Sequence, residues 1–311
     1  MLRHFPFEES FDPGMGMRLL KTHEPLCEVD LSRYQEETSL KQRLLAEAHS
    51  YYFHGGDATM TAQWDVLELV ATHLARNYPE HFQLEREGDR WRWRNILTGV
   101  MATFRFGDST TLPSEPLDWI GRQVQEDLVV LSADASATFV GGQLCFANGW
   151  AISDRLGKAF HEVHQHTPRA TMPSVETGAR FLQMLKPGRT YWRMSWNFKL
   201  SDQMDMTTQH KPAYKADFAR RAPKLTAEDV GGAVFIRIER QTFTRLPRSE
   251  GLLFGIHTYN SSVAEEATDS RRARCILNVV RGAPRDVKDY KAITPIERPL
   301  ISFLEARASN S

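Results

Sequence analysis

Hydrophobic positions in the first 80 residues recur at helical spacing. Ser39 and Gln42 form a capping-box pair ahead of the segment 40–53, which ends before a double glycine. A second apolar stripe follows at intervals of three and four and ends near residue 78, with members Trp64, Leu67, Val70 and Leu74. The pattern therefore predicts two helices in this part of the chain.

From residue 82 the pattern changes to the period of two that is typical of strands. Residues 82–94 alternate tryptophan with arginine around a turn at 87–89, which predicts a hairpin. A short helix within 114–127 should lead into a strand at 128–131. Two further strands, joined by a turn at Gly141-Gly142, should follow.

The longest alternating segments lie in the second half of the chain. Residues 191–200 place large apolar side chains on one face and polar ones on the other. Segments 233–247 and 252–259 predict a hairpin with a loop of about four residues. Because the strands run in meander order with helices before, between and after them, we predict an α+β fold with an antiparallel sheet flanked by helices. We expect disorder only in the tail 306–311.

Composition narrows the function classes. The chain has 311 residues and balances 39 acidic with 39 basic ones, without a run of like charge that would favour nucleic acid or a membrane surface. Its three cysteines stand far apart, which argues against a zinc finger, a cysteine-held iron–sulfur cluster and a disulfide framework. The beginning of the chain lacks signal-peptide features, and no apolar stretch approaches the roughly 18 residues of a membrane span. We expect a soluble, cytoplasmic protein.

Three histidines lie within the segment HEVHQHTP, residues 161–168. Pro168 should end any helix that carries them, and His161 and His164 would share a face of its last turn. Imidazole nitrogens suit zinc, non-haem iron or haem iron, whereas basic side chains at a helix end also complement the helix dipole. The segment lacks the HExxH form, and a haem iron requires only one histidine. Haem is therefore the least demanding of the metal hypotheses.

The predicted strand within 233–247 carries a second set of candidate functional residues. One face carries mostly polar side chains between phenylalanines, and the other is mostly apolar. The polar face consists of Phe235, Arg237, Glu239, Gln241, Phe243 and Arg245, and the other face of Val234, Ile236, Ile238, Arg240 and Thr242. A buried polar row requires partners or a ligand, whereas a solvated sheet face does not. No GxGxxG after a strand, P-loop or GxSxG supports nucleotide binding or hydrolase chemistry.

The order of several motifs resembles one family. The motifs are GMRLLKTHEPLCEVDLSRYQEETSLKQRLLAE, VQEDLVVL, LCFANGW, GKAFHEVH, RMSWNF and IRIERQTFTRLPRSEGLLFGIHTY, and RxERQTxxRLP is the most specific part. Together they resemble the alpha subunit of haem-dependent oxidative N-demethylase over nearly the whole chain. The resemblance implies a single haem-binding domain over 1–311. Residues 81–260 would form a PAS-like core, after a mainly helical extension (1–80) and before a C-terminal segment (261–311).

The resemblance also implies a chemistry. A single histidine would hold haem b, and the family's (I/V)H pair falls on Val163-His164, so His164 is the expected axial ligand and His161 the reserve. Reduced haem would activate dioxygen, and a dimethylamine-like secondary amine would be demethylated in a monooxygenase-type reaction that releases formaldehyde. Electrons would come from NADPH through FMN and a [2Fe–2S] cluster on partner subunits.

Polar residues of the 233–257 region would serve this site. The resemblance favours Glu239, Arg237 and Gln241 as catalytic residues and Arg240, Arg245 and His257 as cofactor-binding residues. Residues 165–168 depart from the family's usual xPVP-like string, and His257 stands where arginine is more usual. A haem-based gas or redox sensor and a non-haem metal site on His161 and His164 are the alternative hypotheses.

Overall fold

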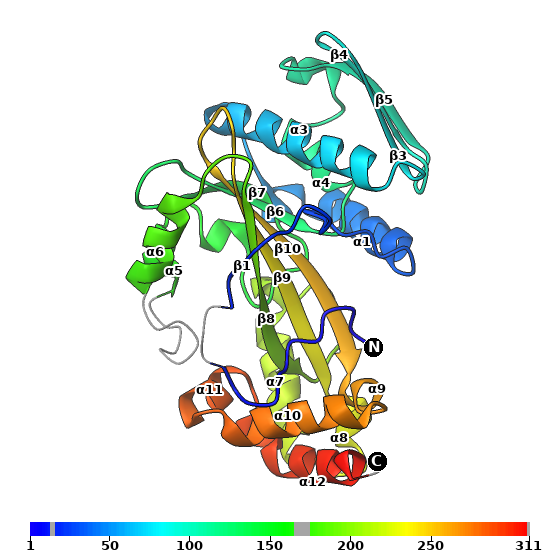
Figure 1. The fold of residues 1–311 in the computed structure, drawn as a ribbon, viewed down its shortest axis with the longest axis vertical. Helices are drawn as coiled ribbons and strands as arrows, with labels where there is room; N and C mark the ends of the chain where they lie inside the picture. Colours follow the sequence, from blue (N-terminus) through cyan, green and yellow to red (C-terminus); the bar gives the residue numbers. More distant parts are fainter. Residues whose placement is uncertain (13–15, 165–174, 310–311) are drawn as a thin grey trace.

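Two antiparallel sheets organise the chain in a computed structural model that describes residues 1–12, 16–164 and 175–309 (Figure 1). The larger sheet has the order β1-β8-β9-β10-β6-β7-β2, and the smaller has the order β3-β4-β5. The strands are β1 (Arg18–Leu19), β2 (Phe53–His54), β3 (Phe82–Glu87), β4 (Arg90–Asn95), β5 (Val100–Arg105), β6 (Asp127–Leu131), β7 (Phe139–Gln143), β8 (Thr190–Lys199), β9 (Phe235–Arg245) and β10 (Leu252–Ser262). The predicted α+β class with an antiparallel sheet is confirmed.

Helices pack against both sheets and connect them, and in the part of the chain that the structure describes the small sheet has helices on one face only (Figure 1). Within the described residues they are α1 (Tyr34–Glu47), α2 (His49–Tyr52), α3 (Met60–Asn77), α4 (Pro116–Gly121), α5 (Phe160–His164), α6 (Val175–Met184), α7 (Lys211–Arg221), α8 (Val230–Ala233), α9 (Val263–Glu266), α10 (Ser270–Gly282), α11 (Arg285–Tyr290) and α12 (Glu297–Ala308). Short 3-10 turns join them: η1 (Asp57–Thr59), η2 (Ser109–Thr111), η3 (Ile152–Asp154), η4 (Thr208–His210), η5 (Ala222–Lys224) and η6 (Thr294–Ile296). The two helices predicted near the start of the chain correspond to α1 and α3. The predicted start of the first at Ser39 is wrong, because Ser39 lies inside α1, which begins at Tyr34 and ends at Glu47.

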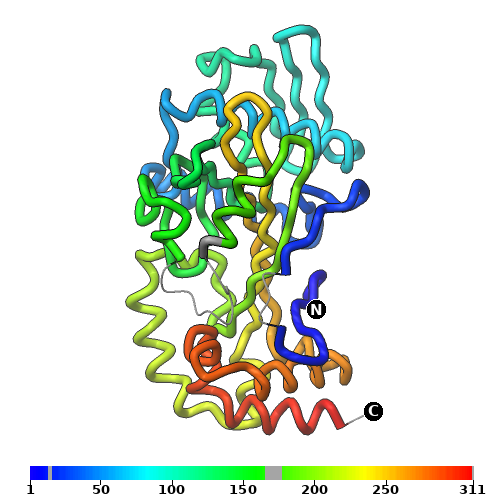
Figure 2. The backbone as a smooth tube through the Cα atoms, turned by 60° about the vertical axis from the view of Figure 1, so that its left-hand side comes forward, coloured from blue at the N-terminus to red at the C-terminus, as the bar shows by residue number. Residues whose placement is uncertain are grey.

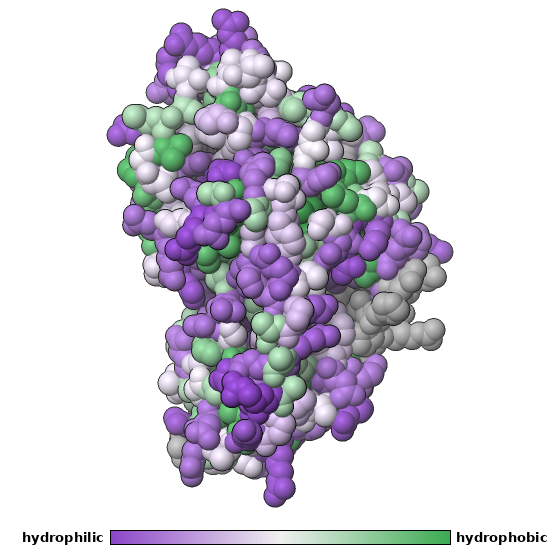
Figure 3. All heavy atoms as spheres, turned by 180° about the vertical axis from the view of Figure 1, so that it is seen from behind, coloured by the Kyte–Doolittle hydropathy of each residue, from purple (hydrophilic) through white to green (hydrophobic). Residues whose placement is uncertain are grey.

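The long strands β8, β9 and β10 run along the length of the molecule (Figure 1). Figure 2 shows the small sheet at one end of them and the C-terminal helices at the other. Within the described residues, buried apolar side chains form three clusters: one around α3 and the small sheet, one between β8–β10 and α10 with α12, and one around α5 and β6. Seen from the opposite side in Figure 3, hydrophobic residues at the surface form separate patches among hydrophilic ones.

The order of the strands departs from a simple meander. Strands β8, β9 and β10 follow one another in the sheet, but β10 pairs next with β6, which precedes it by more than 100 residues. On the other side, β1 covers only a short part of β8, where Arg18 pairs with Trp192 and Leu19 with Tyr191. Most of the outer edge of β8 is therefore not covered by β1.

The double glycine at 141–142 lies inside β7, so the predicted turn there is wrong. A Cβ on Gly141 would lie 2.8 Å from the His54 carbonyl oxygen in β2, and one on Gly142 would lie 2.8 Å from the Leu128 carbonyl oxygen in β6. The glycines allow three backbones to approach closely. The expected disorder of the tail 306–311 is also partly wrong, because α12 extends through residues 306–308.

Gly141→Ala should lower the free energy of unfolding by about 1–3 kcal/mol, because the new methyl group meets fixed backbone rather than a flexible side chain. Urea denaturation would measure the change. Gly232→Ala in α8 is the matched control, since a Cβ there meets nothing within 4 Å. Equal effects of the two substitutions would contradict the packing role of Gly141.

Candidate functional site

A cavity of about 260 Å³ lies against one face of the large sheet, beside α5. Aromatic and aliphatic side chains make up much of its wall, and several polar side chains project from β8 and β9. The lining residues are Phe11, Asp12, Leu131, Phe139, Asn148, Trp150, Arg155, Phe160, Val163, His164, Arg193, Met194, Ser195, Trp196, Asn197, Glu239, Gln241, Phe243, Phe254, Ile256, Tyr290 and Lys291. Its volume lies slightly below the range typical of small-molecule sites, roughly 300–1,000 Å³.

His164, the last residue of α5, lines this cavity with one ring nitrogen already engaged. Its Nδ1 lies 2.8 Å from the Phe160 carbonyl oxygen one turn earlier, and the two rings also lie against each other. Because a carbonyl oxygen only accepts hydrogen bonds, Nδ1 must carry the proton and Nε2 keeps its lone pair. Burial is the main cause that lowers the pKa of His164 to about 4, and Arg193 and Arg155 add to the effect. The imidazole is therefore neutral near pH 7.

A chain of hydrogen bonds joins three polar side chains on the cavity face of β8 and β9. Arg193 lies opposite Gln241 in the strand register, and Ser195 lies opposite Glu239. Arg193 Nε donates to Gln241 Oε1 at 2.8 Å, and Gln241 Nε2 donates to Glu239 Oε2 at 2.8 Å. Because a guanidinium only donates hydrogen bonds, the side-chain amide of Gln241 must turn its oxygen to Arg193 and its nitrogen to Glu239. The carboxylate of Glu239 is thereby held at the cavity wall.

Basic side chains line the cavity without a carboxylate partner among the described residues. Arg155, Arg193 and Lys291 all line it, yet none forms an ion pair with a carboxylate of the described residues. Arg155 Nε is buried without a hydrogen-bond partner. Burial is the main cause that lowers the pKa of all three groups. A buried guanidinium nitrogen without a partner is costly, so the wall at Arg155 suits a ligand that carries acid groups.

The structure places the sequence-predicted residues in two groups. His164, Glu239 and Gln241 meet at the cavity. Arg237 lies on the same face of β9, but its guanidinium is buried and donates to the backbone carbonyls of residues 146, 203 and 204. Arg245 also donates to carbonyls, those of residues 182, 185 and 250.

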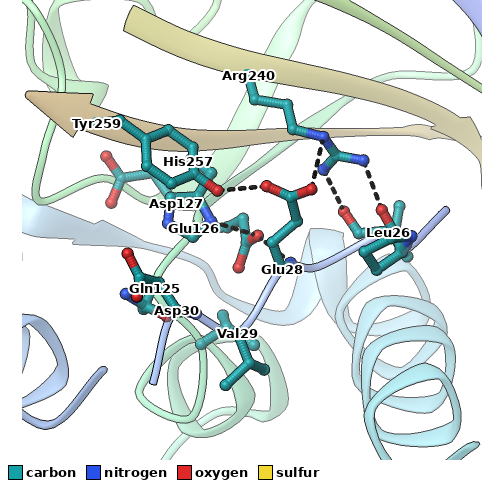
Figure 4. Close-up of polar contacts among 12 residues, drawn as sticks. Leu26, Glu28, Val29, Asp30, Gln125, Glu126, Asp127, Arg240, His257 and Tyr259 are labelled. Carbon is teal, nitrogen blue, oxygen red and sulfur yellow. Dashed lines mark hydrogen bonds and ion pairs between the residues drawn. The ribbon is translucent and has the colours of Figure 1, made fainter. Parts of the chain in front are cut away.

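Arg240 and His257 lie on the opposite face of the sheet. Arg240 donates to the carbonyls of Pro25 and Leu26, and its Nε lies 3.5 Å from Glu28 (Figure 4). His257 Nδ1 lies 2.9 Å from Glu126. These two residues therefore contact residues 25–28 and Glu126, directly before β6, rather than the cavity. His161 is exposed, and His166 falls outside the described residues.

The paired groups on this opposite face form a buried network. The Tyr259 hydroxyl donates to Glu28, and His4 lies 2.8 Å from the same carboxylate. The backbone N–H of Glu28 donates to Glu126 at 2.7 Å. Interaction with Glu126 raises the pKa of His257 against the opposing effect of burial, which indicates a charged pair. The network joins the N-terminal segment to the sheet.

Sequence reasoning missed Arg155, Arg193 and Lys291. Alternation along residues 191–200 put Arg193 on a polar face, which was a usable signal once its strand was placed beside β9. Arg155 in the loop before α5 and Lys291 after α11 belong to no alternating or helical pattern that points to a site. Their contribution follows only from the tertiary structure.

The fold and the cavity define an α+β protein whose cavity is lined by a neutral histidine and a hydrogen-bonded carboxylate. The family described as "Haem-dependent oxidative N-demethylase, alpha subunit-like" matches residues 17–301, and the chain belongs to this family. The family resemblance found in the sequence is thus confirmed. The family's name indicates an oxidative N-demethylase subunit that depends on haem and acts with other subunits. Among the described residues, no helix is long and apolar enough to cross a membrane.

Proposed function

We propose that this chain binds haem b through His164 and demethylates a small secondary methylamine such as dimethylamine. The observation that carries the proposal is the state of His164: its Nδ1 is committed to a carbonyl, and a neutral Nε2 remains available in an aromatic cavity. A hydrogen bond at the second nitrogen is the usual way in which proteins orient a metal-ligating imidazole. His161 is a poor alternative because it is exposed.

The rest of the cavity fits the chemistry of haem. A porphyrin is flat and apolar with two carboxylates, so it requires aromatic walls and cationic side chains. The cavity offers the rings of Phe139, Trp150 and Phe243 and the guanidinium groups of Arg155 and Arg193, and Arg155 Nε has no hydrogen-bond partner. We assign the carboxylates to these two arginines. Arg240, Arg245 and His257 have other partners and are left out of the proposal.

Glu239 and Gln241 would act on the substrate. A secondary amine is a cation near pH 7, and a buried carboxylate can accept hydrogen bonds from its N–H groups. Gln241 holds the Glu239 carboxylate in one orientation, so the amine would be oriented with its methyl group fixed. When bound, haem supplies the iron that activates dioxygen for oxidation of that methyl group. The aromatic wall would exclude water and favour the cationic substrate.

The finer features of the proposal follow the family resemblance. They are a PAS-like core within a single haem-binding domain and electrons delivered from NADPH by partner subunits with FMN and a [2Fe–2S] cluster. They also include release of formaldehyde and a cytoplasmic location. Amine-dependent NADPH consumption with formaldehyde release, measured with the co-expressed partner subunits, would test the function. A haem spectrum without turnover over a panel of methylamines would favour a gas or redox sensor instead.

Glu239→Gln should lower kcat/KM for dimethylamine by roughly 10- to 100-fold, because a hydrogen bond to a charged group contributes about 1.5–3 kcal/mol. The haem absorption spectrum should remain unchanged. Formaldehyde release at several amine concentrations would measure the effect. Glu85→Gln on the exposed face of β3 is the control, and unchanged turnover in Glu239→Gln would remove Glu239 from the substrate site.

A further inference from the structure

Lys291 holds a primary amine at the cavity wall. It follows α11 directly and bridges to the outer edge of β8, where its carbonyl oxygen accepts from the Phe198 N–H at 3.2 Å. Its Nζ donates to the Trp196 carbonyl oxygen at 2.7 Å. The residue is 6% exposed, and it lines the cavity beside Tyr290. Both ends of the lysine are thus fixed, and its amine lies within a confined space.

The surroundings of this amine disfavour its positive charge. Lys291 has no ion pair with a carboxylate of the described residues, whereas Lys288 on the neighbouring turn pairs with Glu297 at 2.6 Å. Burial is the largest influence and lowers the pKa of Lys291 to about 7; Glu239 opposes this shift, while Arg193 and Lys199 contribute to it. The rings of Trp196 and Tyr290 lie 4.8 and 5.4 Å from Nζ.

A neutral amine needs only one of its hydrogens for the Trp196 carbonyl. The nitrogen lone pair then remains for a reaction partner. Neutral amines add to carbonyl carbons, and buried lysines with a lowered pKa are the usual Schiff-base residues of enzymes. Glu239, whose charge acts on this amine, is already hydrogen-bonded to Gln241.

We propose that Lys291 is a covalent site for a small aldehyde. The nitrogen lone pair forms a C–N bond while the carbonyl π bond opens, and the proton released by nitrogen moves to oxygen. The resulting carbinolamine loses water to give an imine, and water reverses both steps. The reaction needs no oxidant or reductant. The source of the aldehyde rests on the proposed function, because demethylation would release formaldehyde in this same cavity.

Reductive methylation tests the proposal without turnover. The purified chain would be treated at pH 7 with limiting formaldehyde and sodium cyanoborohydride, and methylation at each lysine would be followed by peptide mass spectrometry. Lys291 should react about tenfold faster or more than exposed Lys215 on α7, because an ordinary lysine with a pKa near 10.4 is almost fully protonated at pH 7. Its advantage should vanish when both amines are neutral at high pH.

Two results of this experiment would contradict the proposed reactivity of Lys291. Methylation of Lys291 at or below the rate of Lys215 at pH 7 would overturn the proposal. A rate advantage that persists unchanged at high pH would also overturn it, since that would reflect local accessibility rather than a neutral amine. Because formaldehyde is added from outside, these results are independent of haem binding and amine turnover. Failure of the proposed function would therefore be recognised separately, from the absorption spectrum and the turnover assay.

Discussion

His164→Ala is expected to weaken haem binding by about 100-fold or more and to abolish amine turnover. Nε2 of this residue is the only imidazole nitrogen of the described residues that we assign to the iron, and even changes to groups that orient a metal ligand cost about 10–100-fold in affinity. Haem titration of the purified apoprotein, followed through the Soret band, would give the affinity. The shift of that band after reduction and carbon monoxide binding would report the axial ligand.

His161→Ala is the matched control, since this residue lies on the same short helix but is exposed. Its haem affinity and spectra should equal those of the wild type. Circular dichroism of both variants would show whether either substitution disturbs the fold. A wild-type Soret band in His164→Ala, together with its loss in His161→Ala, would transfer the assignment to His161. A wild-type chain without a Soret band after haem reconstitution would remove the haem proposal.

Arg240→Ala should lower the free energy of unfolding by about 3–5 kcal/mol, because it leaves the buried Glu28 carboxylate without its cation. Glu28 is 3% exposed and Arg240 is 2% exposed. The substitution also removes the hydrogen bonds to the carbonyls of Pro25 and Leu26. Urea denaturation at pH 7 would measure the loss. Arg92→Ala, which breaks exposed pairs with Glu85 and Glu87, should cost much less, because solvent screens exposed ion pairs.

The pair of Glu28 and Arg240 also predicts how the free energy of unfolding depends on pH. Burial alone would raise the pKa of Glu28, but the His4 hydrogen bond and the Arg240 charge lower it from 4.5 to about 2. A carboxyl group with a lowered folded-state pKa contributes stability that is complete above the unfolded value and is lost as pH falls from about 4.5 toward 2. This loss should be smaller in Arg240→Ala. Identical acid profiles for the two proteins would show that Arg240 does not act through Glu28.

The sequence was sufficient where local pattern determines structure. The stripe from Trp64 to Leu74 marks the buried side of a helix, so α3 was predicted. The alternation in 191–200 predicted β8, although both faces of this strand are partly buried. The glycines at 141–142 were misinterpreted because their role depends on β2 and β6, whose proximity no local pattern encodes. For the same reason, no local pattern predicted that β6 lies next to β10 in the sheet.

The candidate site was partly predictable for a related reason. Alternation along β9 puts Glu239 and Gln241 on one face and Arg240 on the other, and the structure has this arrangement. Family motifs do not distinguish the two faces, so they listed Arg240 and His257 with the site residues. Whether Arg237 reaches a cavity or backbone carbonyls depends on loops at 146 and 203–204, which lie far away in sequence. Arg155 and Lys291 likewise required the folded chain.

The bridge from Lys291 to β8 also bears on self-association. Strand edges with free N–H and C=O groups are templates for pairing with a second chain, and charged residues at such edges discourage it. The short strand β1 leaves β8 uncovered beyond Trp192, and the bonds of Lys291 to Trp196 and Phe198 occupy that stretch. A substitution that frees this edge would therefore favour an intermolecular β-sheet and aggregation. Lys291 thus also helps to prevent the outer edge of β8 from pairing with a strand of a second molecule.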